Sequence, residues 1–166
     1  MSGDFLAATA KIKERTKIKE ATAAKTKEIN LTERDVEILR FINDFGFCEM
    51  PQIEKRFGFK GARGYQVMQR LMKMQCIKHE RVFHNRHGVY LLTKKGARFT
   101  DLRALNKIPT GNYEHQIAIT NLCIRLRELY PSAQWISERH LQQDKFCDGV
   151  GKIGHLADAM LILEDG

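Results

Sequence analysis

The sequence predicts an α+β protein with two parts: three helices and a β-hairpin in residues 31–103, and a small, incomplete α/β unit in residues 112–166. Two observations support this prediction. The spacing of apolar residues changes from helical to strand-like after Cys76, and a stretch containing Pro109 and Gly111 separates the two parts. A chain of 166 residues, 43% of them hydrophobic, is long enough for one ordinary domain or two small ones.

The composition excludes a membrane-spanning protein. No stretch approaches about 18 consecutive apolar residues, and the N-terminus leads into alternating Lys and Glu instead of an apolar segment. The four cysteines form no CxxC pair that would indicate a zinc ribbon or a redox motif. We therefore expect a cytoplasmic protein with reduced, structural cysteines, no bound metal, no cofactor and no membrane partner.

Residues 1–30 are expected to form a basic N-terminal tail. They are rich in Ala, Lys, Glu and Thr and have few large apolar residues, so they bury little surface alone. A solvated tail and a helix that forms on a binding partner are both consistent with this composition.

A first helix is predicted to begin after Thr32. Thr32 and Asp35 have the spacing of a capping box, in which each side chain accepts a hydrogen bond from the other residue's backbone N–H. A broad apolar stripe from Val36 to Phe45 follows, and Gly46 ends the helix.

Two more helices follow in the same part. Pro51 suits the first turn of a short helix that Gly58 closes, and Lys60-Gly61 forms a turn. A third helix is predicted for residues 62–75, with an inward face made of Val67, Leu71 and Met74.

A β-hairpin and a further helix complete the first part. Strands are predicted for residues 77–83 and 89–92, around a turn at residues 84–88. Thr93 is expected to cap a helix that runs to Leu102.

The order of these elements resembles the winged helix-turn-helix arrangement. Residues 89–96, VYLLTKKG, resemble the second wing strand of that superfamily. The resemblance covers residues 31–103 and implies a DNA-binding domain.

The second part is predicted to follow the connection at residues 104–112. Asn112 can cap a long helix that Pro131 stops. The apolar face of this helix is expected to comprise His115, Ile119, Leu122, Leu126 and Leu129, with His115 as a core histidine.

Strands are predicted at residues 135–138 and 159–163, the second of them buried, with a loop at residues 142–154 between them. Asp165-Gly166 is a turn motif with no returning strand. We expect either that the native polypeptide is longer or that another chain completes this sheet.

The positive charge of the chain is concentrated in one segment. The net charge is +8, and residues 55–103 alone carry 13 basic and 2 acidic side chains, a net charge of +11. Residues 31–54 come to −4 and residues 104–166 to −2. A basic field confined to one segment is typical of a module that binds a polyanion, so nucleic acid is the leading partner.

The third helix carries the side chains expected to contact double-stranded DNA. Arg and Gln form paired hydrogen bonds with base edges in the major groove, and Lys and Arg hold phosphates. The predicted base contacts are Arg63, Tyr65, Gln66 and Gln69, and the predicted phosphate contacts on this helix are Arg70 and Lys73. A solvated helix face would have the same spacing. The other predicted contacts lie in the turn before this helix, in the hairpin and at the start of the next helix: Lys60, Arg81, Arg86, His87, Lys94 and Lys95.

No motif indicates an enzyme strongly. Ser-His-Asp, P-loop and GxGxxG patterns are absent from the sequence, and no Cys or carboxylate lies close enough in sequence to His84 and His87 to suggest a metal site.

Three short motifs resemble the plasmid replication-relaxation family, in which a winged helix precedes a restriction-endonuclease-like fold. They are Tyr113-Glu114-His115, residues 135–139 and residues 155–159. The family usually has Arg-Pro-Asp-Ala where this chain has Leu156-Ala157-Asp158-Ala159, so only Asp158 and Ala159 match. By this resemblance Asp158 is a weak candidate for a catalytic metal ligand, and the second carboxylate and the Lys of such a nuclease would lie beyond Gly166.

Three hypotheses follow. The first is a winged-helix DNA-binding protein of a mobile element, acting in plasmid replication, mobilisation (conjugation) or their regulation, with other DNA-processing proteins as partners. The second is a transcription regulator in which residues 112–166 serve formation of a homodimer or the sensing of an effector. The third, a metal-dependent nuclease or relaxase, requires residues that this chain does not contain.

Overall fold

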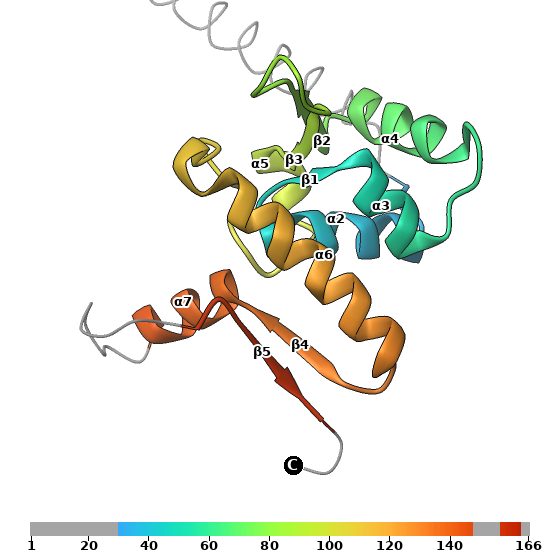
Figure 1. Ribbon diagram of the computed structural model, residues 1–166. Helices are drawn as coiled ribbons and strands as arrows, with labels where there is room; N and C mark the ends of the chain where they lie inside the picture. Colours follow the sequence, from blue (N-terminus) through green and yellow to red (C-terminus); the bar gives the residue numbers. More distant parts are fainter. Residues whose placement is uncertain (1–29, 148–156, 164–166) are drawn as a thin grey trace, which may run out of the picture. The chain divides into compact units, whose positions relative to one another are not determined.

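The computed structural model describes residues 30–147 and 157–163, so nearly all of the tail predicted for residues 1–30 lies outside the described residues. The described residues from Leu31 onward belong to one compact unit. The fold is α+β, as the sequence predicts, with helices and two small antiparallel sheets (Figure 1). None of the described helices combines the length and the apolar character that crossing a membrane requires.

Helix α2 (Glu33–Phe45) begins at the predicted capping box. The backbone N–H of Asp35 donates to Thr32 Oγ1 at 3.2 Å, and the N–H of Thr32 donates to Asp35 Oδ2 at 2.9 Å. The apolar stripe is buried except for the half-buried Val36, and Gly46 ends the helix with a φ of 81°, which favours glycine. Both predicted ends of this helix are confirmed.

Helix α3 (Met50–Phe57) has Pro51 in its first turn and ends at Gly58 in the left-handed conformation, as predicted. A two-residue strand, β1 (Cys48–Glu49), precedes it. This strand was not predicted, because two residues are too few to show an alternating pattern.

Helix α4 (Arg63–Lys73) is present, but its inward face is rotated from the predicted one: Leu71 is buried as predicted, whereas Met74 is only half-buried. Gly64, Met68 and Leu71 are buried, whereas Val67 is only half-buried. Gly64 explains the rotation: a Cβ at this position would lie 2.3 Å from Met50 Cε, so the helix approaches α3 through its glycine.

Strands β2 (Ile77–Glu80) and β3 (Val89–Leu92) form the predicted hairpin, although β2 ends three residues before the predicted end. The sheet is antiparallel with strand order β1-β3-β2, so β3 is central. Every residue of β3 is buried, because the strand has a neighbour on each edge and helices pack against it.

Helix α5 (Lys94–Ala97) is capped by Thr93, whose Oγ1 accepts from the N–H of Gly96 at 3.1 Å. The cap is confirmed, but the helix does not run to Leu102 as predicted. Leu102 instead turns inward and is buried.

A short 3-10 turn, η1 (Thr110–Asn112), leads into helix α6 (Tyr113–Leu129). The predicted apolar face of this helix is wrong, since Leu122 and Leu129 are 49% and 56% exposed. The buried residues are instead Tyr113, Ile117, Thr120, Cys123 and Ile124. Asn112 makes no capping hydrogen bond through its side chain.

Polar anchors set the rotation of α6. Tyr113 stacks on Phe47 with ring centroids 5.2 Å apart, and its hydroxyl donates to Glu49 Oε1 at 2.9 Å. Gln52 donates to the backbone oxygen of Ile117 at 3.1 Å. These contacts favour a face that apolar spacing alone does not reveal.

The two predicted parts share a hydrophobic cluster. Ile108, in the stretch predicted to be a connection, joins Tyr113 and Ile117 of α6 against Phe47, Val89 and Leu91. The division into separate domains at residues 104–112 therefore stays a prediction.

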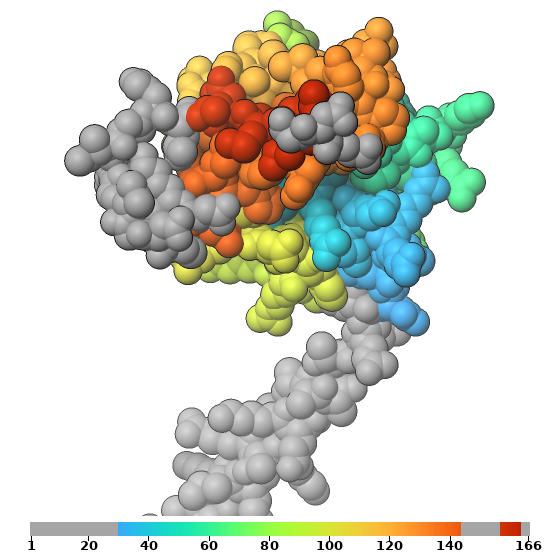
Figure 2. All heavy atoms as spheres, turned by 90° about the horizontal axis from the view of Figure 1, so that it is seen from below, coloured from blue at the N-terminus to red at the C-terminus, as the bar shows by residue number. Residues whose placement is uncertain are grey.

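Strand β4 (Gln134–Ser137) confirms the strand predicted at this place and pairs antiparallel with β5 (Ala159–Ile162). Helix α7 (Glu138–Cys147) occupies the first residues of the predicted loop, so that prediction is wrong for residues 142–147, while residues 148–156 lie outside the described residues. Strand β5 is not buried as predicted. Met160 and Ile162 are 45% and 41% exposed, and Figure 2 shows this strand, in red, open at the surface beside orange atoms of the preceding elements.

Candidate nucleic-acid interface

The outer face of α4 consists of polar side chains turned away from Gly64, Met68 and Leu71. In a helix with 3.6 residues per turn, Gln66 and Lys73 lie directly opposite this buried face, with Gln69, Arg70 and Arg63 beside them. We call these five residues the α4 face. All but Arg70 are exposed, and Tyr65, at the edge, is 50% exposed.

Arg70 differs from its neighbours on the α4 face because it forms an ion pair with Asp35. Asp35 is buried and also accepts the capping hydrogen bond from Thr32. The Arg70 guanidinium therefore compensates a carboxylate at the start of α2. The other four residues of the α4 face have no ion pair or side-chain hydrogen bond to the described residues.

The hairpin tip, residues 84–88, holds two of the predicted contacts. Arg86 forms an ion pair with Glu114 at the start of α6, and His87 is exposed. Arg81 donates to the backbone oxygen of His84 at 3.0 Å, which fixes the base of the tip. Both arginines of the hairpin thus have partners within the chain.

The start of α5 lies against the end of α4. Thr93 Oγ1 donates to the backbone oxygen of Gln75 at 2.6 Å, and the Thr93 N–H donates to that of Cys76 at 3.0 Å. Gly96 packs so closely that a Cβ would lie 1.9 Å from the Cys76 oxygen. This junction places Lys94 and Lys95 next to the C-terminal end of α4, where Lys73 lies.

Helix α4 and the β2–β3 hairpin lie side by side in Figure 1, and α4 packs against β2. The structure therefore places α4 next to the hairpin and the start of α5, the elements that carry most of the predicted contacts. Lys60, in the turn before α4, is exposed. The ion-pair partners Asp35 and Glu114 were not predicted, because both are distant in sequence from the arginines that they bind.

Asp158, the weak catalytic candidate, lies just before β5 and is half exposed. His115 Nε2 is 3.1 Å from its Oδ1. His115 is therefore not a core histidine as expected, since α6 turns it outward. Among residues 30–147 and 157–163, no three His, Cys, Asp or Glu side chains gather to hold a metal ion.

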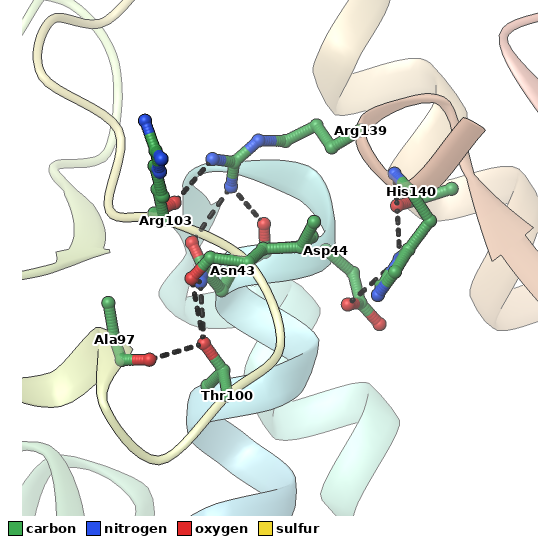
Figure 3. A network of polar contacts seen from close by, with 9 residues as sticks. Asn43, Asp44, Ala97, Thr100, Arg103, Arg139 and His140 are labelled. Carbon is green, nitrogen blue, oxygen red and sulfur yellow. Dashed lines mark hydrogen bonds and ion pairs between the residues drawn. The ribbon is translucent and has the colours of Figure 1, made fainter. Parts of the chain in front are cut away.

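A second polar cluster joins α2 to α7 (Figure 3). Arg139 donates to the backbone and side-chain oxygens of Asn43, at 2.8 Å for Asn43 Oδ1, and to the Arg103 oxygen at 2.7 Å. Beside it, His140 Nδ1 is 3.7 Å from Asp44 Oδ1 and 3.0 Å from Ser137 Oγ. Because a single ring nitrogen faces both partners, this is not the relay geometry of a catalytic triad, which uses both nitrogens.

Burial controls the titration of this cluster and of the cysteines. It raises the pKa of Asp44 to about 6, against the opposing effects of His140, Arg127 and Arg139. Burial also raises the pKa of the Cys48, Cys76 and Cys123 thiols, all of which are free. These three thiols are protonated at neutral pH and unsuited to nucleophilic chemistry.

Comparison of the chain with models of protein families and with curated proteins finds no match.

Proposed function

We propose that residues 31–103 form a winged helix-turn-helix domain that binds duplex DNA. The order of elements supports the proposal: α2, α3 and α4 precede the β2–β3 hairpin, and the short β1 adds a third strand to the sheet. In this arrangement α4 is the recognition helix and the hairpin is the wing.

The main support for the proposal is the exposure and positive charge of the α4 face. Arg63, Gln66, Gln69 and Lys73 present donors and acceptors to solvent, and they belong to a segment with a net charge of +11. The DNA major groove admits one α-helix, and Arg and Gln match the edges of guanine and adenine. If the α4 face only contacted solvent, the additional cations on α5 and the hairpin would have no explanation.

The residues divide into base and phosphate contacts. Arg63, Tyr65, Gln66 and Gln69 contact base edges, and Lys60, Lys73, Lys94 and Lys95 hold phosphates. Arg81 and His87 of the hairpin lie along the DNA backbone. Arg70 and Arg86 add to DNA binding only when phosphates replace Asp35 and Glu114 as their ion-pair partners.

The proposed setting is a mobile element, where the protein acts in plasmid replication, mobilisation or their regulation together with other DNA-processing proteins. This rests on the resemblance of residues 31–165 to the plasmid replication-relaxation family. A nuclease activity in the same setting would need ligands in addition to Asp158, whose described ion-pair partner is His115.

A dimeric transcription regulator is the second candidate. Exposed apolar side chains on α6 and around β5 favour it, since such residues are common where copies of a chain meet. They are Leu122, Leu129, Tyr130, Met160, Ile162 and Leu163. A palindromic binding site would support this candidate, and a site at an origin or transfer region would support the first.

Sequencing of DNA fragments recovered with the purified protein tests the proposal. We expect enrichment of one or a few sequences by the wild-type protein and its loss in a Gln66→Ala, Arg63→Ala variant. Arg125→Ala, at an exposed position of α6, is the control for the lost charge and should keep the enrichment. Equal recovery of all fragments by the three proteins would contradict base recognition by α4.

A further inference from the structure

A hollow of about 470 Å³ lies beside α5, between this helix and the segment that follows it. We call it the α5 hollow. Its charged lining residues are Lys94, Arg98, Asp101 and Arg103, and Ala97 and Leu102 contribute apolar surface. Of these residues, only Lys94 belongs to the DNA contacts proposed above.

The lining of the α5 hollow has a surplus of positive charge. Three cations face one carboxylate, and none of the three cations has an ion pair with a described carboxylate. Arg98 and Arg103 are exposed, so their guanidinium groups are free to bind a ligand. A guanidinium presents several N–H donors that match the oxygens of a phosphate.

The wall of the hollow is fixed in place by the cluster in Figure 3. Asn43 Nδ2 donates to Thr100 Oγ1 and to the backbone oxygen of Leu102, each at 2.7 Å. Arg139 donates to the backbone oxygen of Arg103 at 2.7 Å. These bonds hold residues 100–103 against α2 and α7, so binding a ligand would not require this segment to become ordered first.

We propose that the α5 hollow binds a phosphate ester. Its volume lies within the range of small-ligand sites, and its lining combines cations with an apolar wall that a nucleobase can contact. The phosphate can come from a free mononucleotide or from the DNA backbone. In the second case the inference rests on the proposed function, and Lys94 then links the hollow to the α4 face.

Titration with adenosine 5′-monophosphate tests the first source. In amide NMR spectra of the full chain, we expect saturable shifts at residues 97–106 that weaken at least ten-fold in Arg98→Gln, Arg103→Gln. The control variant Arg40→Gln, Arg125→Gln removes two exposed charges outside the hollow and should bind as the wild type does. Unchanged thermal unfolding would show that the variants fold.

Binding of a labelled random duplex by the same proteins tests the second source. If the hollow holds a backbone phosphate, Arg98→Gln, Arg103→Gln should lose more DNA affinity than the control and show a shallower salt dependence. Either result supports the inference and identifies the source. No saturable shift with the nucleotide, together with equal DNA binding by both double variants, would overturn it. Failure of the wild type to bind DNA would count against the proposed function, and the nucleotide titration would still decide the inference.

Discussion

The α4 face and the hairpin tip both belong to the positive segment, but they hold their cations differently. On the α4 face, Arg63 and Lys73 are exposed and have no ion pair with the described residues, and only Arg70 is paired, with Asp35. At the hairpin tip, Arg86 is paired with Glu114, and its side chain is 41% exposed. Both regions are rich in basic residues, so composition does not distinguish them.

This difference determines how each region can meet a polyanion. An unpaired cation gains a phosphate partner and releases counterions, whereas a paired one must first give up its carboxylate. The α4 face is therefore expected to dominate both affinity and sequence preference. The hairpin tip is expected to add less to DNA affinity, because Arg86 must first lose its ion pair with Glu114.

The largest effect is expected from breaking the junction that joins Lys94 and Lys95 to the end of α4. In Gly96→Ala, the new Cβ would overlap the Cys76 backbone oxygen, which cannot move without disturbing β2. We expect a loss of about 3 kcal/mol in the free energy of unfolding. Chemical denaturation measures it. Stability equal to the wild type would show that the close packing of α5 on this turn is wrong.

Next in size is the effect of the α4 face on sequence preference. Arg63→Ala or Gln66→Ala should reduce preference for the cognate site by about 1–3 kcal/mol while leaving random-sequence binding nearly intact. Lys94→Ala with Lys95→Ala should weaken all sequences alike. Competition titrations with cognate and random duplexes separate the two effects. Parallel losses on both duplexes in every variant would remove the distinction between base and phosphate contacts.

Asp44, unlike the exposed cations of the α4 face, is an ionisable group that lies largely inside the protein. Because burial raises its pKa to about 6, the folded state binds a proton more tightly than the unfolded state, in which the pKa is about 4. The contribution of Asp44 to the free energy of unfolding is therefore most favourable below pH 4 and becomes less favourable as the pH rises from about 4 to about 6. The groups that oppose this shift are His140, Arg127 and Arg139, while Asp101 adds to it.

Asp44→Asn should remove this pH dependence. We expect the variant to be more stable than the wild type by about 1–2 kcal/mol at pH 7.5 and equal to it near pH 4. Thermal unfolding across this pH range measures the difference. A variant less stable than the wild type at pH 7.5 would mean that contacts with the neighbouring cations outweigh the cost of burial.

The smallest effect is expected at the hairpin tip. Glu114→Gln frees Arg86 and removes a negative charge beside the proposed DNA surface, so affinity for any duplex should rise roughly two- to five-fold. Glu128→Gln, which removes a carboxylate paired with Arg125 on the same helix, is the matched control. Fluorescence anisotropy with a labelled duplex can resolve this change. A decrease in affinity would show that Glu114 positions Arg86 for DNA instead of competing for it.

Local patterns made much of the fold predictable from sequence. The capping box at Thr32, the glycine after α2 and the Thr93 cap depend on residues within one helical turn, and all three are confirmed. The polar face of α4 was also located by spacing. Its exposure follows because the opposite side packs on α3.

The features that the sequence did not predict depend on contacts between residues far apart in the chain. The buried face of α6 includes Tyr113 and Thr120, which a count of apolar residues passes over, and hydrogen bonds from Tyr113 and Gln52 fix its rotation. Helix α7 has no apolar stripe to predict it. The ion pairs of Arg70 and Arg86 connect residues 35 and 28 positions apart, so no local pattern could indicate that these two arginines differ from Arg63.

The salt dependence of duplex binding shows whether the unpaired cations around α4 bind DNA phosphates. If the unpaired cations around α4 neutralise about four to six phosphates, log affinity against log salt should fall with a slope of roughly −4 to −5. Anisotropy titrations of a random duplex between low and moderate salt give this slope. We expect a steep slope that Lys94→Ala, Lys95→Ala flattens by roughly one unit for each phosphate that the variant no longer binds. A slope near zero for the wild-type protein would contradict the proposed role of these cations.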